Sequence, residues 1–177
     1  MNIVLLTGSA HRSGTTAALA REFQRGAEDA GHEVFRFDAA FRDVHPCIGC
    51  DRCRREGVCT FAADDMKRLN PHLLAAEAVV FVSPIYYFDL SAQLKAVIDR
   101  FYANDDALHG GKRALLLTAM ADEDLGAAEG ADATFRSICA YLQWENAGIL
   151  NAASASTAED LTEEDLRRAY DLGKDLK

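Results

Sequence analysis

The chain has 177 residues, the length of one domain, and 49% of them are hydrophobic while 27% are charged. This balance is typical of a packed globular protein and excludes a disordered chain. The net charge of −9 disfavours nucleic acid as a partner, because an acidic surface repels a phosphate backbone. No apolar run reaches the roughly 18–20 residues of a membrane helix, and the first one, residues 3–6, is too short for a signal peptide. We therefore expect a cytoplasmic protein with no membrane partner and a single domain over residues 1–177.

The first forty residues are predicted to form a strand, a helix and a second strand. Residues 3–6 are a continuous apolar run that ends at Thr7-Gly8, the pattern of a strand buried on both faces in a parallel sheet. The next apolar residues recur at helical spacing before Gly31, a common residue at a helix end, and they are Leu19, Phe23, Ala27 and Ala30. A second strand is predicted over residues 33–37.

The same alternation continues to the end of the chain. Helices are predicted over residues 64–76, 90–101 and 133–142 and after Thr162, and further strands over residues 78–82, 114–117 and 147–151. Five short strands that alternate with helices predict an α/β fold with a doubly wound parallel sheet.

Two local signals refine the helix predictions. Asn70-Pro71 predicts a kink in the helix over residues 64–76, or its division into two short helices, because proline lacks a backbone donor. Thr162 can cap the last helix, and Leu161 and Leu166 have the spacing of a hydrophobic staple.

Residues 8–16, between the first strand and the first helix, have the composition of an anion-binding loop. Ligands of doubly wound sheets bind at the carboxyl ends of the strands, and a helix N-terminus there adds about half a positive charge. The spacing of the glycines excludes both a Walker P-loop and a Gly-x-Gly-x-x-Gly motif. The alternative is an ordinary loop capped by Ser13. The candidate ligands of the anion are Ser9, His11, Arg12, Ser13, Gly14, Thr15 and Thr16.

Residues 83–89 follow the third predicted strand and contain three consecutive aromatic residues, Tyr86, Tyr87 and Phe88. Successive side chains of an extended segment alternate in direction, so these three cannot all turn inward. At least one is expected to face solvent or a ligand, and a planar ring system is the ligand that suits it. The alternative is that they pack as core between strand and helix.

Four of the five cysteines lie within thirteen residues, at positions Cys47, Cys50, Cys53 and Cys59. In a reducing compartment such a group more often binds metal or carries out redox chemistry than forms disulfides. The spacing alone leaves three alternatives open: an iron-sulfur cluster, a loop of free thiols, and zinc. Cys139 lies in a helical stripe and is predicted to be a small buried hydrophobic residue.

The remaining candidate residues are predicted to have structural roles. Asp99 and Arg100 are expected on a solvated helix face, with pairing across a dimer as the alternative. Trp144 is expected in the core or in a dimer contact. Three histidines have no partner at metal-site spacing and are expected at the surface: His45, His72 and His109.

Two motifs carry a resemblance to a known family. The first is Gly-Ser-x-x-x-Ser-Gly-Thr-Thr from Gly8, and the second is Ser-Pro-Ile-Tyr-Tyr-Phe-x-Leu-Ser-Ala-Gln-Leu-Lys-x-x-Ile-Asp-Arg from Ser83. Together they resemble the flavodoxin-like NAD(P)H-dependent FMN reductases, most of all the branch that includes the iron-sulfur flavoproteins. The resemblance covers residues 1 to about 150.

The resemblance implies a fold and a set of cofactor contacts. The fold is a flavodoxin-like, three-layer α/β/α arrangement with a five-stranded sheet of order 2-1-3-4-5. The FMN phosphate would lie in the loop from Ser9 to Thr16, and the flavin ring would lie against Pro84, Ile85, Tyr86, Tyr87 and Phe88. A third loop, Thr118 to Gly126, would lie along the other edge of the flavin, with Thr118 and Ala119 as cofactor contacts. Cys47, Cys50, Cys53 and Cys59 resemble the ligands of a 4Fe-4S cluster, but relatives without a cluster share the pattern, so we favour a thiol loop.

The resemblance also implies a function. We expect a homodimeric FMN-dependent oxidoreductase that accepts hydride from NAD(P)H and passes electrons to a small acceptor, such as a quinone, a flavin, a nitro or azo compound, or a metal ion. The flavin carries this chemistry, so no protein residue is expected to act as a catalytic acid or base. The alternatives are a flavin electron carrier, with or without an iron-sulfur cluster, that has no enzymatic activity, and a flavin-free α/β interaction module.

Overall fold

The apolar runs of the sequence form the strands of one sheet. In the computed structural model, which describes residues 1–177, the parallel strands are β1 (Asn2–Thr7), β2 (Glu33–Asp38), β3 (Ala78–Tyr86), β5 (Arg113–Ala119) and β6 (Glu145–Ala152). Their order is β2-β1-β3-β5-β6. In terms of the parallel strands this is the predicted order 2-1-3-4-5, and the flavodoxin-like fold is confirmed.

A sixth strand, β4 (Asp89–Leu90), was not expected. It pairs antiparallel with the end of β3, with Ile85 opposite Leu90 and Tyr86 opposite Asp89. The third strand was predicted to end at residue 82, but this pairing and the continued pairing of Ser83 and Pro84 with β5 extend it to Tyr86. The aromatic segment therefore begins inside a strand and turns back on itself.

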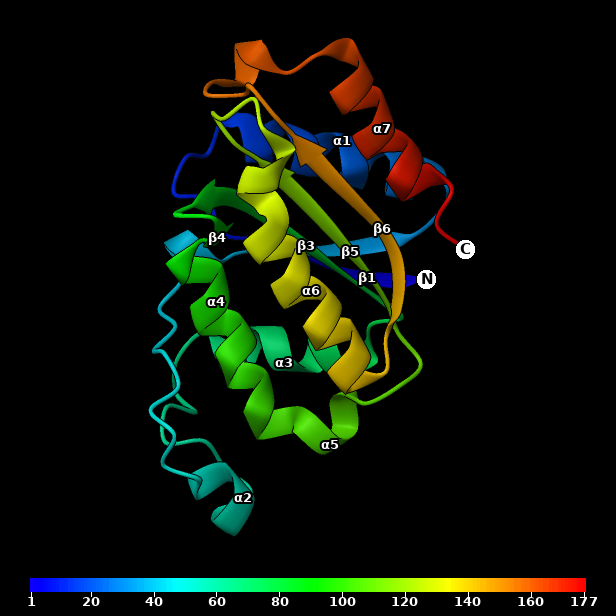
Figure 1. Ribbon diagram of the computed structural model, residues 1–177. Coiled ribbons are helices and arrows are strands. Elements are labelled where there is room, and N and C mark those ends of the chain that lie inside the picture. Colours follow the sequence, from blue (N-terminus) through cyan, green and yellow to red (C-terminus); the bar gives the residue numbers. More distant parts are fainter.

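Helices cover both faces of the sheet (Figure 1). One face carries α1 (Thr15–Asp29) and α7 (Glu163–Lys174), and the other carries α3 (Met66–Ala75), α4 (Ala92–Asp99), α5 (Asp105–Leu108) and α6 (Glu129–Leu142). The short helix α2 (Arg52–Glu56) lies away from the sheet, at the bottom of Figure 1. Four 3₁₀ segments complete the chain: residues 39–41, 100–104, 125–128 and 158–160.

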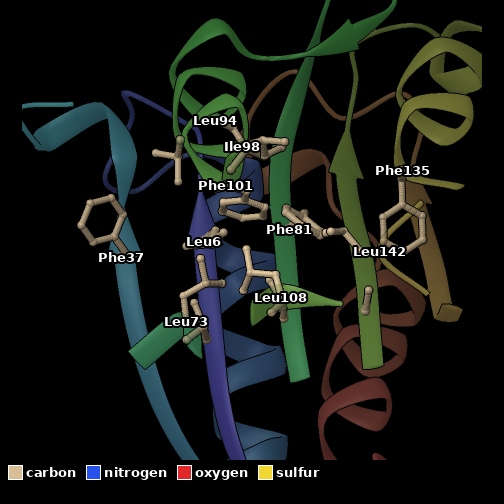
Figure 2. Close-up of a cluster of buried hydrophobic side chains, with 14 of the residues drawn as sticks. Leu6, Phe37, Leu73, Phe81, Leu94, Ile98, Phe101, Leu108, Phe135 and Leu142 are labelled. Carbon is tan, nitrogen blue, oxygen red and sulfur yellow. The ribbon is translucent and has the colours of Figure 1, made fainter. Parts of the chain in front are cut away.

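Alternating side chains of the central strands separate the core into two layers. On β1, Val4 and Leu6 join the cluster that packs against α3, α4 and α6, while Ile3 and Leu5 join the cluster beneath α1 and α7. Figure 2 shows the first cluster, in which Phe81 of β3 lies among aromatic and aliphatic side chains of the covering helices. A strand with both faces buried must be apolar at every position, which is why the runs in the sequence are continuous.

Three local expectations have definite outcomes. The side chain of Thr162 accepts a hydrogen bond from the Asp165 backbone N–H, which confirms the predicted cap of α7. The division of the helix around Pro71 was wrong, because α3 is a single helix. Pro71 is the sixth of the ten residues of α3, and the helix continues through it with the loss of the hydrogen bond to the Lys67 carbonyl. No helix of the chain combines the length and the apolar character needed to cross a membrane.

The expectation of a solvated Arg100 was also wrong. Arg100 and Asp64 form an ion pair in which each side chain is only 3% exposed. The two residues are far apart in the sequence, and the helical pattern around Arg100 gives no sign of its partner. Trp144 belongs to the core, where its indole N–H donates to the Leu108 carbonyl. The single-domain organisation remains a prediction.

Candidate functional site

The predicted anion-binding loop lies at the carboxyl end of β1 and leads into α1. Backbone N–H groups of Thr15, Thr16 and Ala17 precede the first hydrogen bond of the helix, which runs from Ala18 to the Gly14 carbonyl. No side chain caps this helix, so the alternative of a loop capped by Ser13 is not supported. The unpaired donors point at the space in front of the helix. This is the arrangement that binds phosphate groups.

A small cavity of about 60 Å³ adjoins the loop. The Arg12 guanidinium lies over the ring of Phe41, with Cζ 3.6 Å from the ring centroid, and this contact fixes an otherwise exposed cation at the rim. On the other side, Asp38 accepts hydrogen bonds from the Thr7 hydroxyl and from Arg36. The cavity is lined by Thr7, Ser9, His11, Arg12, Thr16, Ala17, Arg36, Asp38 and Phe41.

The aromatic segment, residues 86–88, begins at the last residue of β3 and forms an exposed turn before β4 (Figure 1). It is called the aromatic loop below. Tyr86 is 51% exposed, Tyr87 99% and Phe88 63%. The prediction that the three cannot all be core is confirmed, and the alternative of core packing is wrong. Tyr87 and Phe88 both adopt the left-handed backbone region, with φ of 46° and 67°. This conformation is costly for large side chains, and such strain is concentrated at binding sites.

Contacts with α6 hold the aromatic loop in this conformation. A Cβ atom built on Gly130 would lie 2.2 Å from the backbone oxygen of Phe88, so only glycine permits this approach. Asp89 accepts a hydrogen bond from the hydroxyl of Thr134, one turn further along the helix. The exposed rings are therefore presented on a fixed backbone.

Two buried serines join the aromatic loop to the anion-binding loop, and neither was among the predicted site residues. The Ser91 hydroxyl donates to the Gly8 carbonyl at 2.9 Å, and the Ser91 backbone N–H donates to the Ser83 hydroxyl oxygen at 2.9 Å. Both serines are fully buried. Ser91 also caps α4, and a serine before an amphipathic run is the signal that could have identified it.

The predicted third contact, at Thr118 and Ala119, lies at the end of β5. Both residues are buried, and the Thr118 hydroxyl donates to the Asn151 side chain at 2.7 Å. Asn151 is in turn bonded to Asp132 of α6. The side-chain polar atom of Thr118 is thus engaged within the protein, and a flavin contact at this position remains a prediction.

The four clustered cysteines lie in a long segment that packs against the end of α4. Cys47 and Cys50 are exposed, while Cys53 and Cys59 are half-buried. A hydrogen bond between the Cys50 sulfur and the Thr60 hydroxyl, and one from the Arg52 backbone, lower the pKa of Cys50. Arg54 fixes the tip of the segment through hydrogen bonds to Asp105 and Asp106.

The arrangement of the four cysteines does not fit a metal centre. All four border one small pocket beside Arg100, yet no three metal-ligating side chains of the chain are grouped so that they could hold an ion. A cluster requires four thiolates directed at one centre. These cysteines are therefore assigned no electron transfer through a cluster. As predicted, Cys139 is buried, and burial raises its pKa to about 11.

The donor set at the sheet edge does fit the groups of FMN. An uncapped helix N-terminus, hydroxyl side chains and Arg12 suit a doubly charged phosphate. The exposed rings of the aromatic loop suit stacking on a planar ring system. The two features are adjacent at the carboxyl ends of β1 and β3, where ligands of doubly wound sheets bind.

Comparisons with known proteins agree with this geometry. The family described as NADPH-dependent FMN reductase matches residues 1–154. An iron-sulfur flavoprotein of Methanocaldococcus jannaschii is 33% identical over 100 residues, covering 56% of this chain and 51% of that protein. An FMN-dependent NADH:quinone oxidoreductase of Methylorubrum extorquens is 30% identical over 126 residues, covering 63% of this chain and 62% of that protein. The matched region spans about half the length of the iron-sulfur flavoproteins.

Solved structures show the same fold. The NAD(P)H:quinone oxidoreductase from Methanothermobacter marburgensis has a TM-score of 0.73 to this chain at 20% sequence identity, covering 99% of this chain and 95% of that one. At this level of identity the likeness concerns the fold alone. It extends over nearly the whole chain, including the part after residue 154 that the family match does not reach.

Proposed function

We propose that this chain, which belongs to the NADPH-dependent FMN reductase family, is an oxidoreductase that binds FMN, takes hydride from NADH or NADPH and passes electrons to a small acceptor. One observation carries the proposal: an uncapped helix N-terminus and an exposed aromatic loop lie together at the carboxyl edge of the sheet. The acceptor classes are quinones, flavins, nitro and azo compounds and metal ions. The relative named as a quinone oxidoreductase supports the first of these.

The anion-binding loop would hold the phosphate of FMN. Backbone N–H groups of Thr15 and Thr16 would donate to its oxygens, and the Ser13 and Thr15 hydroxyls would add further donors. Arg12, held over Phe41, would complement the charge. Hydrogen bonds to a charged acceptor are stronger than neutral ones, so this loop would supply much of the binding free energy.

The aromatic loop would hold the flavin ring. Pro84 and Ile85 are half-buried at the end of β3, and the rings that follow them are exposed, so the segment offers an apolar surface at the sheet edge. The flavin, when bound, supplies the hydride and electron-transfer chemistry. The side chains here bind and orient the cofactor and limit the access of water to one side of it. None of them is assigned the role of a catalytic acid or base.

The test is a reduction experiment on the protein reconstituted with FMN. NADH or NADPH added without oxygen is expected to bleach the visible flavin band, and a quinone added afterwards is expected to restore it. An electron carrier without enzymatic activity would bind FMN but would not be bleached by either nucleotide. A flavin-free interaction module would remain colourless after reconstitution. Either of these results contradicts the proposal.

A double variant in the anion-binding loop tests the assignment of the phosphate. Ser13→Ala with Thr15→Ala is expected to weaken FMN binding by about 2–3 kcal/mol, because each lost hydrogen bond to an anion contributes about 1–1.5 kcal/mol. Flavin fluorescence quenching measures the affinity. An unchanged affinity would place the phosphate elsewhere.

We also propose that the protein is a homodimer. Tyr87 and Phe88 are 99% and 63% exposed, and a second copy would cover these rings and the open flavin face. Sedimentation should then show a species of twice the 19.3 kDa chain mass. A single 19.3 kDa species at micromolar concentration would contradict the dimer.

For the cysteine segment we propose free thiols and not a cluster. The support is that no three of Cys47, Cys50, Cys53 and Cys59 are grouped so that they could hold a metal ion, although all four border one pocket. Iron and sulfide assays on protein purified without oxygen test this, and about four irons per chain would overturn it. Free thiols and the use of NAD(P)H both agree with the expected cytoplasmic location.

A further inference from the structure

We propose that Ser91 is a positioning residue. It fixes the position of the anion-binding loop relative to the aromatic loop and so makes the site bind FMN more tightly than riboflavin. The inference rests on the proposed function, since it concerns the same cofactor. It assigns to a buried hydroxyl, which does not touch the cofactor, control over how well the phosphate is held.

Ser91 is bonded to both sides of the site. Its hydroxyl donates to the Gly8 carbonyl at 2.9 Å and accepts the Leu94 N–H at 3.4 Å. Its backbone N–H donates to the Ser83 hydroxyl oxygen, and the Ser83 hydroxyl donates to the Pro84 carbonyl at 2.8 Å. Ser91 therefore connects Gly8, which directly follows β1, to the end of β3 and to the first turn of α4.

Gly8 is held both by hydrogen bonds and by close packing. Its N–H donates to the Val82 carbonyl at 2.8 Å, while its carbonyl accepts from Ser91. A Cβ atom on Gly8 would lie 2.2 Å from the Ser91 oxygen and 2.8 Å from Leu94 Cβ. The base of the anion-binding loop is thus clamped between β3 and α4.

Beyond Gly8 the loop has few bonds of its own. The His11 N–H donates to the Ser9 hydroxyl oxygen, and the Gly14 N–H donates to the His11 carbonyl at 3.3 Å. Ser13 is exposed, and regular backbone hydrogen bonding resumes only in α1. Because the loop has so few bonds of its own, the direction in which it leaves β1 depends on the hydrogen bonds that Gly8 forms with Val82 and Ser91.

This dependence affects the two halves of FMN differently. The flavin ring needs only the aromatic loop, whose backbone is held by Gly130 and Thr134 in addition to Ser91 and so depends less on Ser91 alone. The phosphate needs the anion-binding loop at a suitable distance from the ring, because the two ends of FMN are covalently linked and must be bound at the same time. Pre-organisation of the second loop therefore strengthens FMN binding and leaves riboflavin, which lacks the phosphate, unaffected.

The test compares the two ligands in Ser91→Ala. We expect FMN affinity to fall about ten-fold, the size of one well-placed hydrogen bond, and riboflavin affinity to change by less than about two-fold, within ordinary mutational scatter. Fluorescence quenching measures both constants on the full chain. The matched control is Thr162→Ala, which removes the same kind of helix cap from α7, on the opposite face of the sheet from α4, and should change neither affinity.

Each result decides the inference. Equal losses for FMN and riboflavin in Ser91→Ala, or no loss for either, would assign Ser91 to helix capping alone and overturn the proposal. If Ser91→Ala does not fold, Ser91→Gly provides the test, because it also removes the hydroxyl that donates to the Gly8 carbonyl, while glycine is well tolerated at a helix N-cap. It should lower the ratio of FMN to riboflavin affinity in the same direction, and an unchanged ratio contradicts the inference. Failure of the unmodified protein to bind FMN would instead refute the proposed function.

Discussion

The guanidinium of Arg100 and the carboxylate of Asp64 form an ion pair beneath the cysteine segment, with Nη1 2.5 Å from Oδ2. Arg100 also donates to the carbonyls of His45 and Phe61, at 2.7 and 3.1 Å. Asp64 accepts the N–H of His45 at 3.1 Å. His45 precedes the first cysteine of the segment and Phe61 follows the last, so the pair holds both ends of the cysteine segment against α4.

Removal of the charge of Asp64 should therefore be costly. Asp64→Asn leaves Arg100 buried without a counterion, and the free energy of unfolding is expected to fall by about 3–5 kcal/mol. Urea unfolding measures the loss, and limited proteolysis should show earlier cleavage within residues 46–60. Asp106→Asn is the control, because Asp106 pairs with Arg54 at 91% side-chain exposure and its loss should cost less than about 1 kcal/mol. Equal losses in the two variants would contradict this role.

The same pair predicts the acid response of the protein. Burial raises the pKa of Asp64, but hydrogen bonds from Arg100 and from the backbone of Met66 and His45 outweigh burial and hold it below its usual range. The stabilisation is complete above the unfolded-state pKa of about 3.9 and is lost as pH falls through the lower folded-state value. The unfolding free energy of the native protein should therefore fall more steeply below about pH 4 than that of Asp64→Asn. Parallel acid curves would contradict this.

The sequence predicted those features that depend only on residues close together in the chain. Continuous apolar runs predicted the central strands, because both faces of a parallel sheet are covered, and Thr162 predicted a helix start, because a cap acts within one turn. Long-range pairings could not be predicted in this way. Nothing near Arg100 indicates Asp64, and nothing in the Ser-Pro step after residue 82 indicates that β4 extends the strand.

The candidate site divides in the same way. The hydroxyl-rich loop and the aromatic run were visible as local compositions, and the structure places them at neighbouring strand ends. The link through Ser91 was not visible, because it joins residues 83 positions apart. The close approach of Gly130 to the Phe88 carbonyl was equally hidden. Geometry that holds a site in place is made of such distant contacts.

The close contact between α1 and α7 predicts that Gly173→Ala destabilises the protein, although helix propensity alone would predict stabilisation. Gly173→Ala in α7 should stabilise an isolated helix by about 0.5–1 kcal/mol. In this fold the added Cβ would lie 2.1 Å from the Phe23 carbonyl oxygen and 2.8 Å from the Ala27 nitrogen, so the two helices must separate. We expect a loss of about 1–3 kcal/mol, the cost of overpacking, measured by thermal or urea unfolding.

Arg168→Ala is the matched control for that contact, since Arg168 is exposed on the same helix and forms no ion pair. It should change stability by less than about 0.5 kcal/mol. A stabilising effect of Gly173→Ala would mean that α1 and α7 are not in close contact.

Thiol labelling should separate Cys139 from the other four cysteines. In metal-free folded protein, an alkylating reagent is expected to modify Cys47 and Cys50, which are exposed, ahead of Cys53 and Cys59, which are half-buried. Cys139 should stay unmodified, because it is 4% exposed and burial raises its pKa to about 11, so almost no thiolate exists at neutral pH. Mass spectrometry of the labelled peptides gives the order. Denaturation before labelling should expose all five thiols, and Cys139→Ala should remove only the label that requires denaturation. Modification of Cys139 in the folded protein at the rate of Cys47 would show that α6 opens from the sheet.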